Sequence, residues 1–347
     1  MKARRRRPNG RFWTLLALVA IIIAAAGFLH RGPRSAAPSQ ARHAAQNSAP
    51  QSAASFALSH WSTVPLTLNQ PMMGFAAVHT PGAIWILGGL INDQSITYIQ
   101  KMGISANGRL HSVRNVPPGL PIANHDGAAV LLGRQVILLG GGSYLSSNAV
   151  FRLPLPRMNP ATTWNALPLP LSDLQAVTDQ NRILVVGGHD SGAPSSTIWV
   201  YNPGHPTKVW AHLPIGVRYA AVARDSHMLY SIGGLSAAGV TRQAVAYNLA
   251  TGKMTKLPPY PMAVQYAEAA VIGGHLVVAG GKTASNWTNA VYWYNSLKHR
   301  WVSAPAMPAP AGYGALVAIS PTQAVWLGGE GPSGTLDVVW RVSASTR

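Results

Sequence analysis

RILVVGG at residues 182–188 is an apolar, strand-like run that ends in a pair of glycines. Related runs recur along the chain: AIWILGG at 83–89, QVILLGG at 135–141, HMLYSIGG at 227–234, HLVVAGG at 275–281 and AVWLGG at 324–329. The first glycines of successive pairs are 52, 47, 46, 47 and 48 residues apart. A period of this length predicts an array of similar supersecondary units that must pack on one another to bury a core.

Each unit has the same expected order of strands. A strand of small residues precedes the apolar run, a strand with aromatic residues such as Trp199 or Tyr247 follows the glycines, and a strand near Trp210 or Trp301 ends the unit. This order resembles the Kelch repeat, in which one unit forms one four-stranded blade of a β-propeller. The resemblance covers nearly everything from residue 58 onward and implies an all-β, six-bladed Kelch-type propeller.

The two ends of the repeat region are expected to complete one blade together. The sixth unit stops after its third strand, TLDVVWRVSA at 335–344, whereas ALSHWSTVPLTLNQP at 57–71 has no earlier strands of its own. The latter reads like the fourth strand elsewhere, as in LKHRWVSAPAMPAP at 297–310. We therefore predict that the N-terminal strand closes the last blade and removes an open sheet edge.

The N-terminal region has the layout of a targeting segment. Residues 1–11 are basic and expected to be cytoplasmic, 12–29 form an uncharged apolar run long enough for a transmembrane signal anchor, and 30–57 form a flexible linker rich in Ala, Ser, Pro and Gln. The propeller at 58–347 is then tethered to the cell membrane by a single pass, outside the cytoplasm in the periplasm or at the cell surface. Small residues at 24–26 leave a cleaved leader and a secreted protein as the alternative.

Composition excludes several kinds of chemistry. With no Cys, the chain has no disulfide, thiolate nucleophile or cysteine-ligated metal. Its 12 His residues fall singly, so no metal and no cofactor is expected. The 27 Lys and Arg are scattered and accompany no recognised binding motif, so no nucleic-acid partner is expected. Having only 9 Asp and Glu suits exposure to acid, because native carboxylates that must be protonated cost stability there.

Counting back from the glycine pairs aligns the strand expected to lie innermost. Eleven residues before each pair the side chains are small, as a crowded axis requires: Ala77, Ala129, Ala176, Val222, Ala269 and Val317. Fifteen residues before it the side chains vary: Met73, His125, Ser172, Arg218, Gln265 and Tyr313. The position after that one holds Gly74, Asp126, Asp173, Tyr219, Tyr266 and Gly314. We expect these last two rows to surround one mouth of a central channel.

The polar members of these rows are the predicted ligand-binding residues. Kelch-type propellers commonly bind ligands at such a mouth, so the resemblance implies a site there. The candidates offer hydrogen bonds and stacking to a sugar or a peptide: His125, Asp126, Asp173, Arg218, Tyr219, Gln265, Tyr266 and Tyr313. The alternative is that they are solvated turn residues, with Asp126 and Asp173 holding turns.

Two further candidates lie twelve residues before their glycine pairs. Gln175 and Glu268 stand there, where three of the other four blades have Ala. In such crowded surroundings we expect the pKa of Glu268 to be shifted, or its carboxylate to pair with Arg218 of the neighbouring blade. A buried structural ion pair is the alternative.

The leading functional prediction is a non-catalytic module that presents its channel mouth to a protein or an anionic glycan at the cell envelope. A distant resemblance to the bacterial N-acetylneuraminate epimerases implies an alternative, a sialic acid epimerase or mutarotase. In that reading Arg218 holds the substrate carboxylate, while Glu268 and His125 act as acid and base at the ring oxygens. A structural subunit of an envelope complex is the third possibility.

Overall fold

The computed structural model describes residues 56–190 and 192–346, and these residues form β-strands without an α-helix. Within this part no helix is long and apolar enough to cross a membrane. The predicted basic segment at 1–11, the anchor at 12–29 and the linker up to residue 55 lie outside the described residues.

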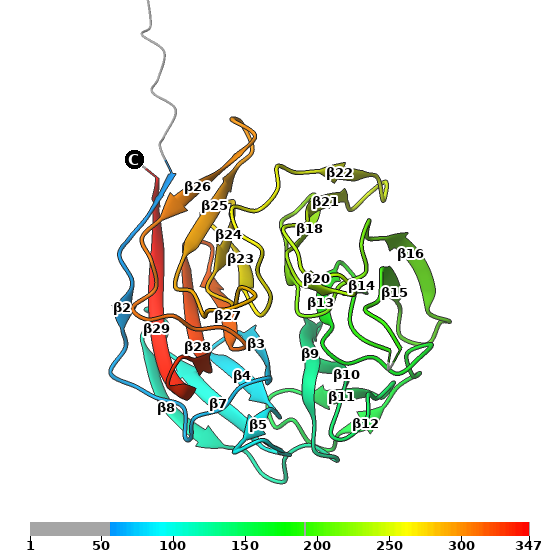
Figure 1. The fold of residues 1–347 in the computed structure, drawn as a ribbon. Coiled ribbons are helices and arrows are strands. Elements are labelled where there is room, and N and C mark those ends of the chain that lie inside the picture. Colours follow the sequence, from blue (N-terminus) through cyan, green and yellow to red (C-terminus); the bar gives the residue numbers. More distant parts are fainter. Residues whose placement is uncertain (1–55, 191, 347) are drawn as a thin grey trace, which may run out of the picture. The chain divides into compact units, whose positions relative to one another are not determined.

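Six antiparallel sheets are arranged in a ring in chain order, so that the last blade lies beside the first (Figure 1). Their strands are given from the inside outward. Blade 1 comprises β3 (Ala76–Thr80), β4 (Ala83–Leu87), β7 (Ile99–Ile104) and β8 (Leu110–Asn115). Blade 2 comprises β9 (His125–Leu132), β10 (Gln135–Gly142), β11 (Val150–Pro154) and β12 (Thr162–Thr163). Blade 3 comprises β13 (Gln175–Asp179), β14 (Arg182–Val186), β15 (Thr197–Tyr201) and β16 (Lys208–His212).

The second half of the ring repeats this arrangement. Blade 4 comprises β17 (Ala221–Arg224), β18 (Met228–Ile232), β21 (Ala244–Asn248) and β22 (Met254–Lys256). Blade 5 comprises β23 (Glu268–Ile272), β24 (His275–Ala279), β25 (Val291–Asn295) and β26 (Arg300–Ala304). Blade 6 comprises β27 (Ala315–Ser320), β28 (Gln323–Gly331) and β29 (Gly334–Thr346), with β1 (Phe56–Leu58) and β2 (Ser62–Thr63) outside them. The predicted six-bladed propeller is confirmed.

The predicted closure of the last blade by the N-terminal strand is also confirmed. Residues of β1 pair with the end of β29, from Phe56 opposite Thr346, and β2 pairs with the same strand nearer its middle. Pairing thus begins at Phe56, inside the stretch expected to be linker. The indole of Trp61, between β1 and β2, donates to Pro305 O of blade 5 at 3.1 Å, just as Trp301 of blade 5 donates to Pro258 O of blade 4 at 2.8 Å.

The glycine pairs join neighbouring blades. The second glycine of every pair donates its N–H to a carbonyl oxygen just before the inner strand of the next blade, at 2.7–3.0 Å. These bonds form a closed circle: Gly89 to Asn124, Gly141 to Leu171, Gly188 to Val217, Gly234 to Val264, Gly281 to Ala311 and Gly329 to Met72. Close approach explains the residue type, because a Cβ on Gly187 would lie 2.5 Å from Val217 O, and its φ of +62° disfavours other residues.

The hydrophobic core is divided into six layers, one between each pair of adjacent blades. The layer between the last and first blades packs Val325 and Leu327 of β28 against Ile84 and Ile86 of β4, and all four side chains are fully buried. Both faces of a blade are therefore apolar, which explains why the second strands read as continuous Val, Ile and Leu runs.

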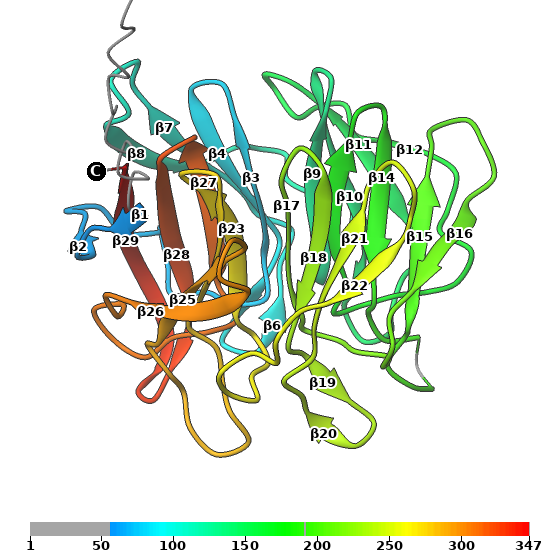
Figure 2. The same ribbon diagram turned by 90° about the horizontal axis from the view of Figure 1, so that it is seen from above.

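Two short hairpins follow glycine pairs, β5 (Leu90–Ile91) with β6 (Gln94–Ser95) and β19 (Leu235–Ser236) with β20 (Gly239–Val240). Figure 2 shows the β19–β20 hairpin projecting from one face of the ring. We call this the doublet face, because the glycine pairs and the loops that follow them lie there. The inner strands begin at this face and run toward the opposite one.

Candidate functional site

A ring of six residues surrounds the axis at the doublet face, one at the start of the inner strand of each blade or two residues before it. Each backbone N–H donates to the carbonyl oxygen of its counterpart in the preceding blade, at 2.8–3.1 Å, and the circle closes from Gly74 to Tyr313. We call this the axial ring: Gly74, Asp126, Asp173, Tyr219, Tyr266 and Tyr313. All six have φ between +56° and +60°. That conformation is uncommon for residues other than glycine, so the surrounding hydrogen bonds and packing must hold it in place.

The axial ring corrects the sequence alignment in blade 6. Counting back from Gly328 placed Tyr313 in the row of Arg218 and His125. It placed Gly314 in the row of Tyr219 and Tyr266, and Val317 in the row of small residues eleven positions before the glycine pair. The pairing of β27 with β28 shifts by one residue between Ala318 and Ser320. This bulge adds a residue between the ring and the glycine pair. Tyr313 is therefore the counterpart of Tyr219 and Tyr266, while Gly312 and Leu316 take the other two positions.

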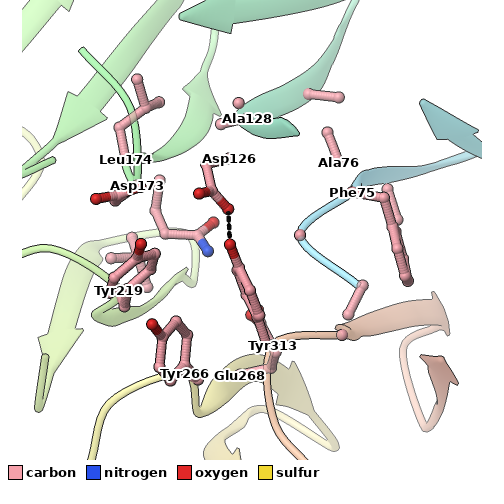
Figure 3. A pocket seen from close by; sticks show the side chains of 18 of the residues that line it. Phe75, Ala76, Asp126, Ala128, Asp173, Leu174, Tyr219, Tyr266, Glu268 and Tyr313 are labelled. Atoms are coloured by element: carbon pink, nitrogen blue, oxygen red, sulfur yellow. Dashed lines mark hydrogen bonds between the residues drawn. The ribbon is translucent and has the colours of Figure 1, made fainter. Parts of the chain in front are cut away.

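The three tyrosines of the axial ring form one aromatic cluster. The ring centroids of Tyr219 and Tyr266 are 4.2 Å apart, and those of Tyr266 and Tyr313 are 4.5 Å apart. Figure 3 shows the cluster beside the two aspartates, with the Tyr313 hydroxyl donating to Asp126 Oδ1 at 2.6 Å. Burial is the main reason that the pKa of each tyrosine is raised, so all three remain neutral hydrogen-bonding groups.

The two aspartates form a buried pair in which the carboxyl groups hydrogen-bond to each other. The pKa of Asp126 is raised well above its ordinary value, first by burial and then by the charge of Asp173, although the Tyr313 hydroxyl and Arg218 oppose the shift. Burial and the neighbouring charge of Asp173 therefore both favour the protonated form of Asp126. Arg218 donates from Nη1 to Asp173 Oδ2 at 3.2 Å and balances the remaining charge.

Two spaces meet at the axial ring. The mouth pocket opens on the doublet face, has a volume of about 370 Å³ and is lined by residues of blades 2, 3 and 4, including His125, Ser146, His189 and Arg218. The axial cavity lies on the inner-strand side of the ring, has a volume of about 200 Å³ and is lined by residues of all six inner strands or of the turns that precede them. Asp126, Asp173 and Tyr219 line both spaces.

The predicted site residues are divided between these spaces. His125 and Arg218 line the mouth pocket, whereas Gln175, Tyr266, Glu268 and Tyr313 line the axial cavity. Gln265 is in the lining of neither, and its buried Oε1 has no hydrogen-bond partner within the described residues. Arg218, His125 and Glu268, the three side chains named for an epimerase-like reaction, therefore do not share one pocket.

Glu268 has the shifted pKa that its position predicted, but it does not pair with Arg218. Burial raises its pKa to about 8. Its remaining accessible surface faces the axial cavity, which is too small to solvate a carboxylate as bulk water does. The Arg218 guanidinium points toward Asp173 instead, and the side chain of Glu268 makes no hydrogen bond or ion pair with any described residue.

His125 is held between two neighbours. Its Nδ1 lies 2.9 Å from Ser95 Oγ on β6, and its Nε2 lies 3.6 Å from Asp126 Oδ2. Burial lowers its pKa, while the charge of Asp173 acts in the opposite direction. The imidazole is therefore mainly neutral at pH 7 and can both donate and accept.

Sequence reasoning missed the loop that forms one wall of the mouth pocket. Ser146 donates to Ser172 Oγ at 3.0 Å, and this anchors the loop to blade 3. Beside it, Tyr144 and Leu145 are 94% and 82% exposed. The sequence signal was an aromatic and an apolar residue one position beyond the Gly140–Gly142 triplet, where the other blades have no such pair. His189, which follows the third glycine pair, is half-buried and also lines the pocket.

Comparison with known proteins agrees with this architecture. The chain matches the Kelch motif family over residues 170–215 and 264–308, and these segments contain the axial ring residues Asp173 and Tyr266. A solved structure described as "Structure of YjhT" aligns with a TM-score of 0.68 and 14% sequence identity, over 82% of this chain and 100% of that chain. No curated protein matches the sequence. Identity this low supports a shared fold alone.

Proposed function

Since this chain is a six-bladed β-propeller that carries Kelch motifs, we propose that it is a non-catalytic binding module whose mouth pocket takes an acidic glycan. The fold alone selects no activity, because propellers serve both as enzymes and as binding proteins. The proposal therefore depends on the chemistry of the pocket wall.

The observation that carries the proposal is the state of Arg218. Its guanidinium makes one hydrogen bond to Asp173, and its side chain remains 31% exposed at the wall of the mouth pocket. An arginine has five N–H donors, so several stay free for a ligand. A planar carboxylate is the group that two parallel guanidinium bonds recognise best.

The rest of the pocket suits a sugar. Tyr144 and Leu145 offer exposed apolar surface at the rim, on which the apolar face of a pyranose ring can stack. Ser146 and His125 add groups that hydrogen-bond hydroxyls. The chain's excess of Lys and Arg over Asp and Glu also favours an anionic partner.

Binding is favoured over catalysis because the candidate acid and base are separated. An epimerase-like reaction at Arg218 would need Glu268 within reach of the same sugar ring, yet Glu268 lines the axial cavity behind the tyrosines. We therefore expect no acceleration of anomer exchange when N-acetylneuraminate is followed by NMR with the full-length protein. Acceleration that Glu268→Gln abolishes would favour the enzymatic alternative.

Replacing Arg218 tests the binding proposal. Titration calorimetry of the full-length protein with N-acetylneuraminate and glucuronate should show saturable binding that Arg218→Gln weakens about tenfold or more, as expected for a lost charged hydrogen-bond pair. Arg224→Gln is the matched control, because Arg224 lies in the same blade and is also half-buried, but lines the opening on the face opposite the doublet face. Equal binding of neutral N-acetylglucosamine, or unchanged binding by a folded Arg218→Gln protein, would contradict the proposal.

We further propose that the propeller is presented outside the cytoplasm by the anchor predicted at 12–29. Support comes from the sequence, in which basic residues precede an uncharged apolar run. An alkaline phosphatase domain fused after Arg347 should be active in a bacterial host, since that enzyme matures only outside the cytoplasm. A fusion that is expressed but inactive would contradict this orientation.

A further inference from the structure

The axial cavity is large enough to hold a small organic molecule. Its volume is about 200 Å³. An apolar cavity of about 150 Å³ in a protein interior can take up benzene, so this space exceeds what a single water molecule needs. Its walls are mostly small side chains of the inner strands, including Ala76, Ala128 and Ala269, and the polar groups gather at the end nearest the axial ring (Figure 3).

The charge of the cavity wall is opposite to that of the chain as a whole. Only 9 of the 347 residues are acidic, yet Asp126, Asp173 and Glu268 all line this space. No Lys, Arg or His among the described residues is in its lining. Folding alone gives no reason to gather carboxyl groups where water is scarce, because burying a charge costs free energy unless it is paired.

Glu268 is the member of this group without a partner. Asp126 and Asp173 hydrogen-bond to each other. Asp126 also accepts a hydrogen bond from the Tyr313 hydroxyl, and Asp173 accepts one from Arg218. Glu268 stands at the start of β23, pairs through its backbone with Ala279, and makes no side-chain hydrogen bond or ion pair with any residue described. A carboxyl group enclosed by protein and directed into a cavity is poised to receive a ligand that bears a donor or a positive charge.

The tyrosines supply the second element of a cation site. Tyr219, Tyr266 and Tyr313 all line the cavity, and their centroids lie within 5.7 Å of one another. Aromatic faces attract cations electrostatically, and cages of such rings recognise alkylated ammonium groups. A metal ion is a poorer fit, because the described residues contain no group of three His, Asp or Glu side chains placed to ligate one.

We propose that the axial cavity is a binding site for a small organic ammonium ion, with Glu268 as the counter-ion and the tyrosines of the axial ring as its aromatic wall. The site lies on the other side of the axial ring from the mouth pocket, with which it shares Asp126, Asp173 and Tyr219 as wall residues, and it does not depend on the proposed function. The ligand enters from the face opposite the doublet face. The opening there has a volume of about 350 Å³ and shares Ala77, Ala129, Val222, Ala269, Leu316 and Val317 with the cavity lining.

Binding of a cation is coupled to release of a proton. The titratable and charged groups around Glu268 are the aspartate pair with its Arg218 partner and the three tyrosines of the axial ring: Asp126, Asp173, Arg218, Tyr219, Tyr266 and Tyr313. Glu268 is mostly protonated below its pKa of about 8, and the cation requires it ionised. The affinity should therefore rise by up to about tenfold for each pH unit below that value and level off above it.

Choline and its uncharged isostere 3,3-dimethyl-1-butanol provide the test, because they have nearly the same shape and differ in charge. Calorimetric titration of the full-length protein at about pH 9 should show choline binding at least about tenfold tighter than the isostere. Glu268→Gln should lose at least about tenfold in choline affinity. Glu330→Gln, which changes the only other glutamate and lies outside the cavity lining, should bind choline as the unaltered protein does.

The pH dependence of the unaltered protein keeps the test valid even if Glu268→Gln fails to fold. Choline binding that strengthens with pH and releases a proton, measured in two buffers of different ionisation enthalpy, supports the proposal. No choline binding at about pH 9, equal affinity for the uncharged isostere, or a folded Glu268→Gln protein that binds choline normally would overturn it. Loss of glycan binding in Arg218→Gln with choline binding retained would show that the two sites are distinct.

Discussion

At the scale of single residues, the molecule places its few acidic side chains in unusual surroundings. Asp126 and Glu268 are both held where burial is the main cause of a raised pKa. A carboxyl whose pKa is higher in the folded state than in the unfolded state binds its proton more tightly when folded. Such a group lowers stability as the pH rises, which is the opposite of the behaviour of surface carboxylates in ion pairs.

This gives a pH window for Glu268. Its pKa is raised from 4.5 to about 8, so its stabilising contribution is complete below about pH 4.5 and is lost as the pH rises through 8. We expect the free energy of unfolding to fall across that window by up to about 1.4 kcal/mol per pH unit. Glu268→Gln should flatten the decline in urea denaturation series, and Glu330→Gln should not. An undiminished decline in Glu268→Gln would show that other groups cause it.

At the scale of elements, the glycine pair is the joint between blades. The second glycine donates a hydrogen bond to the next blade, and the first leaves no room for a side chain at the point of closest approach. A repeat that must make this contact six times accounts for the regular recurrence of the pair in the sequence. The apolar layer that each joint fixes then packs without large gaps.

A pair of Gly→Ala variants separates crowding from backbone strain at this joint. Gly187 and Gly133 have nearly the same φ, +62° and +60°, but a Cβ at Gly187 would lie 2.5 Å from Val217 O, whereas at Gly133 nothing lies within 4 Å. Gly133→Ala should cost about 1 kcal/mol of stability, from the positive φ alone. Gly187→Ala should cost about 3 kcal/mol in chemical denaturation, because crowding is added. Equal costs would mean that the blades shift freely apart.

At the scale of the whole molecule, the ring is closed by residues that are far apart in the sequence. The N-terminal strands supply the outermost part of blade 6, and the apolar layer between β28 and β4 joins the last blade to the first. The hydrogen bonds of the axial ring and those of the glycine pairs each close a circle as well, and neither circle involves the N-terminal strands β1 and β2. Cooperative unfolding of the whole propeller is expected, because opening one joint exposes an apolar layer.

The indole hydrogen bonds of the outer strands test how much the N-terminal strand stabilises the closed ring. Trp61 and Trp301 donate equivalent hydrogen bonds to the preceding blade, at 3.1 and 2.8 Å. Replacing either residue with Phe keeps an aromatic ring and removes the bond, so each change should cost about 1–2 kcal/mol in thermal or urea unfolding. A cost at Trp301 without one at Trp61 would mean that the N-terminal strand contributes little to the stability of the ring.

The sequence predicted the fold and also selected several of the side chains that the structure brings together around the axis. It selected the two rows at the channel mouth and singled out Glu268 and Gln175, because a polar residue among repeated alanines departs from the pattern. It misplaced Tyr313 by one row, and of the two alternatives that it left for Glu268 the pairing with Arg218 was wrong. The bulge in β27 cannot be recognised from the residue types around it. The salt bridge of Arg218 depends on which carboxylate is nearer by a few ångströms.

What the sequence by itself determined is the repeat: six glycine pairs at regular spacing, small inner strands, and an incomplete last unit whose missing strand stands at the other end. Local steric requirements of strands and turns determine these features, so they can be recognised in the amino-acid sequence. Only the tertiary structure decided that five non-glycine residues adopt positive φ around the axis and that their side chains separate a mouth pocket from an axial cavity. It also left the Glu268 side chain without a hydrogen-bond or ion-pair partner among the described residues. Those features arise where six blades converge, and each depends on distances between residues that lie far apart along the chain.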